Sequence, residues 1–283
     1  MTQQRVRSHF TAEAGYWDDV YRQPRGISSL IYRQRHAIAM TWADRVALPA
    51  GARALDLGCG AGATSVALAQ RGLRVTAVDF SEAMLRRARA RAVEANVAGR
   101  VVTELGDAHA LGFADSTFAL VVTLGMLPWL HSVRQALREI VRVLEPGGYV
   151  ILTADNRTRL DYFLDPLHNV ALRPVKHRVR RLLQRLDLWQ KAEPVPTNLY
   201  SWDELLDLLH AAGIEPLATA ALGFGPFTCM GRSVLPSSAA IRVHQLLQHL
   251  AERGTPVLCA TGDQYVVLGR KLPDLARGPS ILK

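Results

Sequence analysis

The sequence predicts an α/β protein built around a doubly wound, mostly parallel sheet of seven strands. Between residues 53 and 153, short runs rich in β-branched residues alternate with segments of helical spacing. The first of these runs leads directly into a glycine-rich turn, as in folds that bind a ligand at the carboxyl ends of their strands. Two more strands near the C-terminus form a late antiparallel pair, which completes the predicted Rossmann-like sheet.

Five predicted strands form the parallel part of the sheet. They cover residues 53–57, 73–78, 100–105, 118–124 and 149–153. Helical patterns separate them: residues 64–71 form a helix that ends at Gly72, Ser81 caps the next helix, and residues 133–144 repeat apolar positions at helical spacing. Strands connected by helices in this way run parallel within one sheet.

The predicted organisation has four parts. They are a helical N-terminal arm (1–48), the core (49–155), an inserted basic helical cap (156–200) and the last part of the sheet (201–283). In the last part, Ser201 is expected to cap a helix over residues 202–213, a second helix is expected over 239–253, and strands are expected over 214–221 and 257–271. In the cap, residues 173–191 predict an amphipathic basic helix, because their apolar residues recur at helical spacing.

Composition excludes several classes of protein. The 283 residues are 49% hydrophobic, enough for a sizeable core, so disorder is excluded as the dominant state. Charges interrupt every apolar stretch before it reaches the ~18 residues of a membrane span. Cys59, Cys229 and Cys259 are too few and too scattered for a disulfide framework or a metal site, so we expect a cytoplasmic protein without a metal. The net charge of +9 favours an anionic partner.

The glycine-rich turn is the main candidate for a ligand site. Asp56, Gly58, Gly60 and Gly62 follow the first strand, and Asp79 ends the second. Glycines let the backbone approach a ligand, and an acid at the second strand can accept hydrogen bonds from ribose hydroxyls. The glycines alone also fit a dinucleotide site. Asp56 argues against it, because a carboxylate there repels a pyrophosphate but suits a ligand with a cationic amino group.

Four motifs give a more specific signal: ALDLGCGAG (54–62), VTAVDFSEAMLRRAR (75–89), GDAHALGFADSTFALVV (106–122) and ALREIVRVLEPGGYVIL (136–152). In order and spacing they resemble the class I S-adenosylmethionine-dependent methyltransferases, in particular the small-molecule branch called methyltransferase type 11. The resemblance implies S-adenosyl-L-methionine as cofactor. It also implies that Gly58, Gly60 and Gly62 line the methionine part and that Asp79 holds the ribose.

The resemblance extends to the adenine end of the cofactor. It implies that Asp107 binds the adenine amino group with Ala108 alongside, and that Leu124 lies beneath the cofactor. Phe80 and Met84 are natural apolar contacts for the adenine, although core packing explains Met84 equally well.

His131 is the candidate general base, since it follows the fourth strand and an imidazole titrates near neutral pH. Its alternative role is to cap the next helix or to pack under the cofactor. In the N-terminal arm, His9, Tyr16, Tyr21 and His36 are comparable candidates, and Tyr16 with Trp17 could close over the cofactor.

The acceptor is predicted from what is missing as well as from what is present. The turn LGMLPW (124–129) lacks the signature of amino-methylating nucleic-acid enzymes, and no Pro-Cys nucleophile is present. A small organic acceptor is therefore expected, methylated on an oxygen of a natural product, quinone or sugar-like metabolite. An RNA methyltransferase and a non-catalytic cofactor-binding module stay open as alternatives.

Two segments bear on the choice of acceptor. The basic residues of 173–191 fit a solvated helix face, an anionic or lipid-like acceptor at a membrane surface, or RNA. Residues 222–235, with Phe224, Phe227 and Met230, fit either an apolar wall of the acceptor pocket or a core-packed loop.

Overall fold

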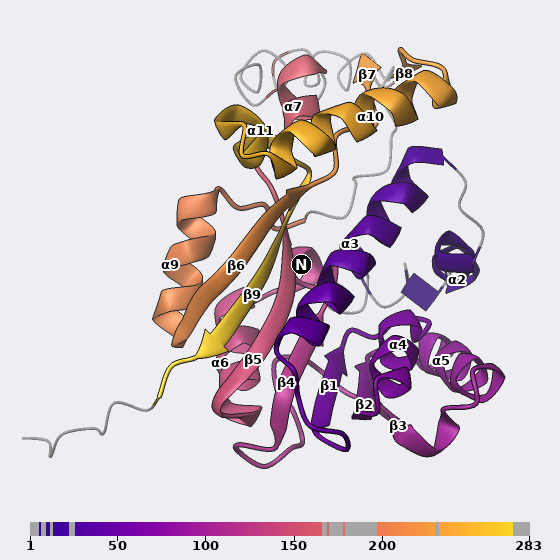
Figure 1. Ribbon diagram of the computed structural model, residues 1–283, viewed down its shortest axis with the longest axis vertical. Helices are drawn as coiled ribbons and strands as arrows, with labels where there is room; N and C mark the ends of the chain where they lie inside the picture. The colour runs from indigo at the N-terminus through magenta and orange to yellow at the C-terminus, as the bar shows by residue number, and fades with distance from the viewer. Residues whose placement is uncertain are drawn as a thin grey trace, which may run out of the picture.

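The protein is a seven-stranded sheet with helices on both faces and a further helical layer beyond one end (Figure 1). The computed structural model describes residues 6, 10–11, 14–22, 26–165, 169, 178, 197–229 and 232–273. The strands are β1 (Arg53–Leu57), β2 (Arg74–Asp79), β3 (Val101–Leu105), β4 (Phe118–Thr123), β5 (Leu144–Asp155), β6 (Ile214–Leu222) and β9 (Gln264–Lys271).

The strand order is β3-β2-β1-β4-β5-β9-β6. All neighbours from β3 to β5 pair in parallel, whereas β9 pairs antiparallel with both β5 and β6. The predicted fold class, with seven strands and a late antiparallel pair, is therefore confirmed. The parallel strands place their carboxyl ends at one edge of the sheet, where a ligand site is expected.

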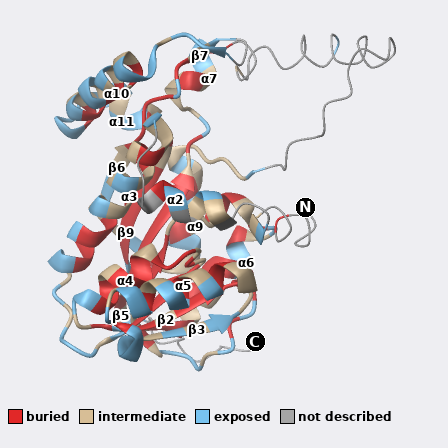
Figure 2. Ribbon diagram, turned by 90° about the vertical axis from the view of Figure 1, so that its right-hand side faces the viewer, coloured by how far each residue is buried: buried red, intermediate tan, exposed pale blue. Residues whose placement is uncertain are grey.

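Helices cover both faces of the sheet, with α3 (Gly26–Arg45), α4 (Ala63–Gln70) and α5 (Glu82–Glu94) on one face and α6 (Val133–Val143) and α9 (Trp202–Ala212) on the other. Neighbouring residues of a strand point to opposite faces: Leu120 joins the core cluster of α3 and α4, and Val121 joins that of α6 and α9. The central strands are therefore buried on both sides, as Figure 2 shows. This is why they occur as continuous apolar runs in the sequence.

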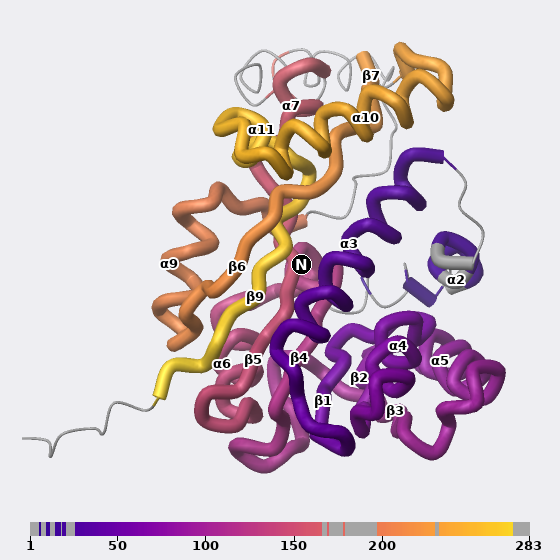
Figure 3. The backbone as a smooth tube through the Cα atoms, in the orientation of Figure 1, coloured from indigo at the N-terminus to yellow at the C-terminus, as the bar shows by residue number. Residues whose placement is uncertain are grey.

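A helical layer lies beyond the carboxyl ends of the strands. It contains α7 (Leu160–Leu164), α10 (Ser237–Glu252), α11 (Pro256–Thr261) and the short hairpin of β7 (Thr228–Cys229) and β8 (Arg232–Ser233). Figure 3 shows the chain entering this layer from β5, returning to it from β6, and leaving it through β9. The N-terminal arm is helical where it is described, with α2 (Ala14–Arg22) beside α3.

The predicted strand over residues 257–271 begins too early, because residues 256–261 form α11 and β9 starts at Gln264. Pro256 occupies the first turn of α11, where a missing N–H costs nothing and the fixed φ suits a helix. The short hairpin of β7 and β8 was also not predicted, since two-residue strands leave no periodic pattern.

The predicted caps are confirmed in part. Ser201 and Glu204 form a complete capping box at the start of α9, and Gly213 ends that helix at φ 84°. Ser81 occupies the N-cap position of α5, but its side chain makes no capping hydrogen bond. Instead its backbone N–H donates to Oδ1 of Asp79 (2.9 Å), so the end of β2 and the start of α5 are joined.

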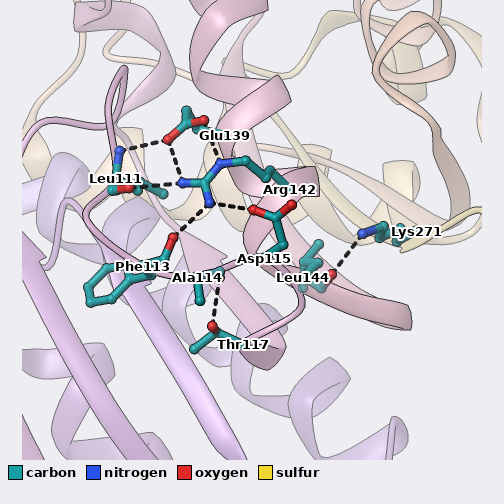
Figure 4. A network of polar contacts seen from close by, with 9 residues as sticks. All are labelled: Leu111, Phe113, Ala114, Asp115, Thr117, Glu139, Arg142, Leu144 and Lys271. Atoms are coloured by element: carbon teal, nitrogen blue, oxygen red, sulfur yellow. Dashed lines mark hydrogen bonds and ion pairs between the residues drawn. The ribbon is translucent and has the colours of Figure 1, made fainter.

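Arg142 of α6 fixes the segment that precedes β4 (Figure 4). Its guanidinium donates to the carbonyls of Leu111 (2.9 Å) and Phe113 (2.7 Å), to Asp115 (2.8 Å), and twice to Glu139. Glu139 also accepts from the backbone N–H of Leu111 (2.7 Å). All five N–H donors of the guanidinium are used, which anchors the chain just after residue 107.

The predicted basic helix of 173–191 lies outside the described residues, apart from Arg178, which is exposed. Within the described ranges, no helix has both the length and the apolar character needed to cross a bilayer.

Candidate active site

A cavity of about 160 Å³ lies at the carboxyl ends of the parallel strands, and a smaller one of about 50 Å³ adjoins it. Both are lined by Gly58, Asp79, Phe80, Met126 and Trp129. The larger cavity lies between the turn after β1, the end of β5 and the N-terminal helices. The smaller one lies between β2 and the segment that follows β3. Together they form a continuous site at the edge where the fold predicts one.

The three glycines of the turn have different functions. Gly58 and Gly60 line the larger cavity, with φ of +74° and +51°. A Cβ on Gly60 would meet no atom within 4 Å, so the space beside it is open. A Cβ on Gly62 would lie 2.8 Å from Cα of Ala88 in α5. Gly62 therefore allows α4 and α5 to pack closely, and the structure does not bring it to the cavity wall.

Asp79 lies where β2 meets the turn. Its side chain is buried, and its two oxygens accept from the backbone N–H groups of Gly60 (2.9 Å) and Ser81 (2.9 Å). Burial raises the pKa of this carboxyl, while those backbone hydrogen bonds lower it. Each carboxylate oxygen can accept a second hydrogen bond, so Asp79 suits a ligand that brings O–H donors.

Asp56 lines the same cavity from β1. Its carboxyl accepts a short hydrogen bond from the hydroxyl of Ser65 in α4. Burial raises the pKa of Asp56 to about 7, and the nearby charge of Asp79 adds to this effect. A cationic group in the cavity would stabilise the ionised form of Asp56.

The smaller cavity has apolar walls and one carboxylate. Leu57, Val78 and Ala108 line it together with Asp107. Oδ1 of Asp107 accepts from the backbone N–H of His109 (2.9 Å) and lies 2.6 Å from Nδ1 of that residue. Oδ2 has no hydrogen-bond partner among the described residues, which leaves an acceptor for a ligand.

The other predicted residues divide between the cavity and the surface. Phe80, Met84 and Leu124 line the larger cavity, as does Trp17. His131 does not line either cavity. It is exposed and stacks on His109, with ring centroids 3.6 Å apart.

The candidates of the N-terminal arm lie away from the cavities or outside the described part of the chain. Tyr16 is 52% exposed, and neither Tyr16 nor His36 lines a cavity. His9 and the side chain of Tyr21 lie outside what the structure describes.

Phe224 and Phe227, from the predicted acceptor wall in residues 222–235, line neither cavity. They pack in an apolar cluster with Ala240 and Ala251 of α10. This packing favours the alternative, a core-packed loop. Met230 lies outside the described residues.

Sequence reasoning missed several polar residues of the larger cavity, among them one arginine, one aspartate and one glutamine. Arg35 comes from α3, Asp155 ends β5 and Gln264 begins β9. A signal for Asp155 was present, because it ends a parallel strand at the same edge of the sheet as Asp79. Arg35 and Gln264 gave no signal, since α3 and β9 reach the cavity only through tertiary packing.

These residues fit S-adenosylmethionine, the cofactor implied by the motifs. The open space beside Gly60 admits a ligand, Asp79 and Asp107 supply acceptors, and the smaller cavity has apolar walls. In addition, Nε1 of Trp17 is a buried donor without a hydrogen-bond partner in the described part of the chain. Buried donors are rarely left unpaired, so a ligand acceptor at this wall would satisfy it. Among the described residues, no group of three or more His, Cys, Asp or Glu side chains could hold a metal ion.

Comparison with known proteins agrees with the geometry. Residues 55–152 match the methyltransferase domain family Methyltransf_11. The chain is 33% identical over 191 residues to the ubiquinone biosynthesis O-methyltransferase of Pseudomonas entomophila (strain L48), which covers 68% of this chain and 76% of the relative. It is 31% identical over 203 residues to the 27-O-demethylrifamycin SV methyltransferase of Amycolatopsis mediterranei (strain S699), covering 71% of this chain.

The chain spans 65% of the length of the rifamycin enzyme and 53% of that of a Pseudomonas aeruginosa ubiquinone biosynthesis O-methyltransferase. Among solved structures, the magnesium protoporphyrin IX methyltransferase of Synechocystis PCC 6803 with bound SAH superposes with a TM-score of 0.64. That match has 16% identity and covers 95% of this chain and 100% of the other, so it shows a shared fold. The chain thus belongs to the class I S-adenosylmethionine-dependent methyltransferases, with the Methyltransf_11 domain over residues 55–152.

Proposed function

We propose that this protein transfers the methyl group of S-adenosylmethionine to an oxygen of a small organic acceptor, such as a natural product, quinone or sugar-like metabolite. The observation that carries the proposal is the composition of the larger cavity. Its lining includes the glycine turn and Asp79, and also a second polar group, in which Gln264 contacts both Arg35 and Asp155. One cavity therefore offers groups for the cofactor and further polar groups for an acceptor.

In this proposal the chain's residues bind and orient the cofactor. Asp79 accepts hydrogen bonds from the ribose hydroxyls, and Oδ2 of Asp107 accepts one from the adenine amino group. Gly58 and Gly60 leave room for the methionine part, beside the carboxyl of Asp56. When bound, the cofactor supplies an activated methyl group on a sulfonium, so the protein's main task is to align the acceptor.

The names of the relatives support oxygen as the accepting atom. The ubiquinone biosynthesis relative is named an O-methyltransferase, and the rifamycin relative is named a 27-O-demethylrifamycin SV methyltransferase. An anionic or lipid-like acceptor stays compatible with the positive net charge and with Arg35 in the cavity. We retain the cytoplasm as the proposed location, because the cysteines are all unpaired thiols.

The test uses S-adenosylmethionine labelled in its methyl group, with a panel of phenols, hydroquinones and sugars. We expect labelled product with at least one hydroxylated acceptor, and mass spectrometry should place the new methyl group on oxygen. Calorimetry with S-adenosylhomocysteine measures cofactor binding independently. Failure to bind it would overturn the proposal, whereas binding without transfer to any acceptor would favour a non-catalytic cofactor-binding module.

A further inference from the structure

Asp155 is a half-buried carboxylate that the proposed cofactor contacts do not use. It ends β5, lines the larger cavity, and is the register partner of Gln264 on β9. Nε2 of Gln264 donates to its Oδ1 at 2.8 Å. Its Oδ2 has no hydrogen-bond partner among the described residues and is not enclosed by protein atoms. One oxygen is therefore held in place, while the other can accept a proton or a hydrogen bond from a ligand.

The carboxylate lies next to the segment proposed to underlie the cofactor. Leu124 and Gly125 follow β4 and line the same cavity. The backbone N–H of Gly125 donates to Oγ1 of Thr153 at 2.7 Å, two positions before Asp155 on β5. This contact ties the end of β4 to the end of β5, so Asp155 stands at the border between the cofactor end and the acceptor end.

Charged groups on several elements surround Asp155. Burial raises its pKa, and the nearby charge of Arg159, the hydrogen bond from Gln264 and the charge of Arg35 oppose this effect. Asp263 lies in the same cluster, beside Arg159 at 3.3 Å. Two further groups that interact electrostatically with this cluster are Asp161 and Tyr162. The raised pKa makes Asp155 a better proton acceptor than an ordinary aspartate.

Aromatic rings line the larger cavity, and one of them, Tyr32, lies under the guanidinium of Arg35 at 4.8 Å. Phe10 meets Trp129 edge to face, with centroids 5.1 Å apart, and the rings of Trp17 and Tyr32 are 5.4 Å apart. All four side chains line the larger cavity. Such rings favour a planar aromatic ligand through edge-to-face and offset contacts.

We propose that Asp155 is the catalytic base for a phenolic acceptor and that Gln264 is its positioning residue. This inference rests on the proposed methyl transfer to oxygen. The O–H bond of the acceptor breaks, its proton goes to Oδ2 of Asp155, and its electron pair stays on the oxygen. That pair forms the bond to the methyl carbon, while the pair of the broken carbon–sulfur bond goes to sulfur. The carboxylic acid then returns its proton to water.

The test compares Asp155→Asn with Asp263→Asn. Asparagine has the shape of aspartate and can still accept from Gln264, but it cannot take up a proton. Asp263 is the matched control, because it is a buried carboxyl of the same cluster that does not line either cavity. Thermal unfolding checks that both variants fold, and calorimetry with S-adenosylhomocysteine should give affinities close to that of the wild type.

Catechol is the probe. In methyl transfer to catechol, Asp155→Asn should lower kcat by about 10²-fold to 10⁴-fold, the usual contribution of a positioned base. In the wild type, kcat should rise with pH as Asp155 ionises, and the Asp155→Asn variant should lose this rise. Asp263→Asn should retain it. The second readout is calorimetric binding of catechol to the S-adenosylhomocysteine complex, from about pH 5 to about pH 8, where a phenol stays protonated. Wild-type affinity should increase with pH and variant affinity should stay flat.

The outcomes separate this inference from the proposed function. If Asp155→Asn keeps the wild-type kcat and pH profile, Asp155 is not the catalytic base. An acceptor that is already anionic and binds beside Arg35 then becomes the better explanation. If the wild-type complex with S-adenosylhomocysteine fails to bind catechol, the phenolic acceptor is overturned, but methyl transfer to another acceptor still stands. Absence of S-adenosylhomocysteine binding would instead remove the proposed function itself.

Discussion

The ring of His131 stacks on the ring of His109, with centroids 3.6 Å apart and planes 28° apart. His109 is buried, and its Nδ1 lies 2.6 Å from Oδ1 of Asp107. His131 therefore covers the outer side of a residue that orients Asp107. This arrangement gives it a supporting function at the proposed adenine site and no direct contact with the cavity.

Replacing His131 with alanine should weaken S-adenosylhomocysteine binding by about 2-fold to 10-fold, the value of one stacked aromatic pair. His131→Phe retains the stack and should bind with wild-type affinity. Both variants should keep kcat at saturating cofactor. An equal and large loss of kcat in the two variants would show instead that the imidazole acts as a base.

Replacing Asp79 with alanine should reduce S-adenosylhomocysteine affinity by roughly 5-fold to 150-fold, or about 1–3 kcal/mol, because the ribose hydroxyls lose a buried acceptor. Asp44→Ala is the control, since Asp44 pairs with Arg71 in an exposed salt bridge remote from the cavity. Calorimetry gives both affinities. Unchanged binding in Asp79→Ala would refute the assignment of the ribose site.

Alanine at two glycines of the turn should have opposite consequences. A Cβ on Gly60 meets open space at the cavity, so Gly60→Ala should lower cofactor affinity more than stability. A Cβ on Gly62 would lie 2.8 Å from the backbone of Ala88, so Gly62→Ala should lower Tm more than Gly60→Ala does. In both variants the left-handed backbone at the new alanine costs roughly 1–2 kcal/mol of stability. Calorimetry and thermal unfolding should rank the two variants in opposite order.

The buried carboxyl of Asp56 should make stability depend on pH. Its pKa is about 7 in the folded protein against 3.8 ordinarily, so between these values the folded state holds a proton that the unfolded state has lost. The free energy of unfolding should therefore fall as pH rises through this window, by up to about 4 kcal/mol from this group. Asp56→Asn should flatten this slope in urea titrations. The other buried carboxyls are the same in both proteins, so an identical slope would contradict the raised pKa.

Replacing Arg142 with leucine should lower the free energy of unfolding by roughly 1–3 kcal/mol, because the carbonyls of Leu111 and Phe113 lose their donor. It should also weaken S-adenosylhomocysteine binding, since the segment after Asp107 loses its anchor. Arg138→Leu, an exposed change on the same helix, should do neither. Urea unfolding and calorimetry measure both effects. Equal effects in the two variants would show that the guanidinium of Arg142 does not anchor the segment after Asp107.

The core of the fold could be predicted because each central strand is buried on both faces, and because helices such as α5 and α6 have one apolar face. The glycine turn and Asp79 could be predicted as well, since both belong to one continuous strand–turn–helix unit. One failure came from a local signal that the prediction overlooked. The apolar residues after Pro256 resemble a strand, yet the proline starts a helix there.

The acceptor end of the cavity shows a different limit. Arg35 and Gln264 are separated by 229 positions, yet the guanidinium lies 3.4 Å from the amide oxygen. The local sequence around Arg35 or Gln264 does not indicate that these two side chains are in contact. The position of His131 was equally hard to foresee. The turn after β4 reaches the cavity through Met126 and Trp129, but His131 is exposed and stacks on His109.

The position of β9 has a consequence for how the protein is made. This strand is inserted between β5 and β6, and Gln264 meets Asp155 only after 109 further positions have been translated. Until then the nascent chain carries β5 and β6 with open edges, which are prone to pair with other chains. Closure of the sheet and completion of the acceptor end therefore happen in a single late step of biosynthesis. A chain that is truncated before β9 contains the complete cofactor turn but lacks Gln264, and with it the finished acceptor pocket.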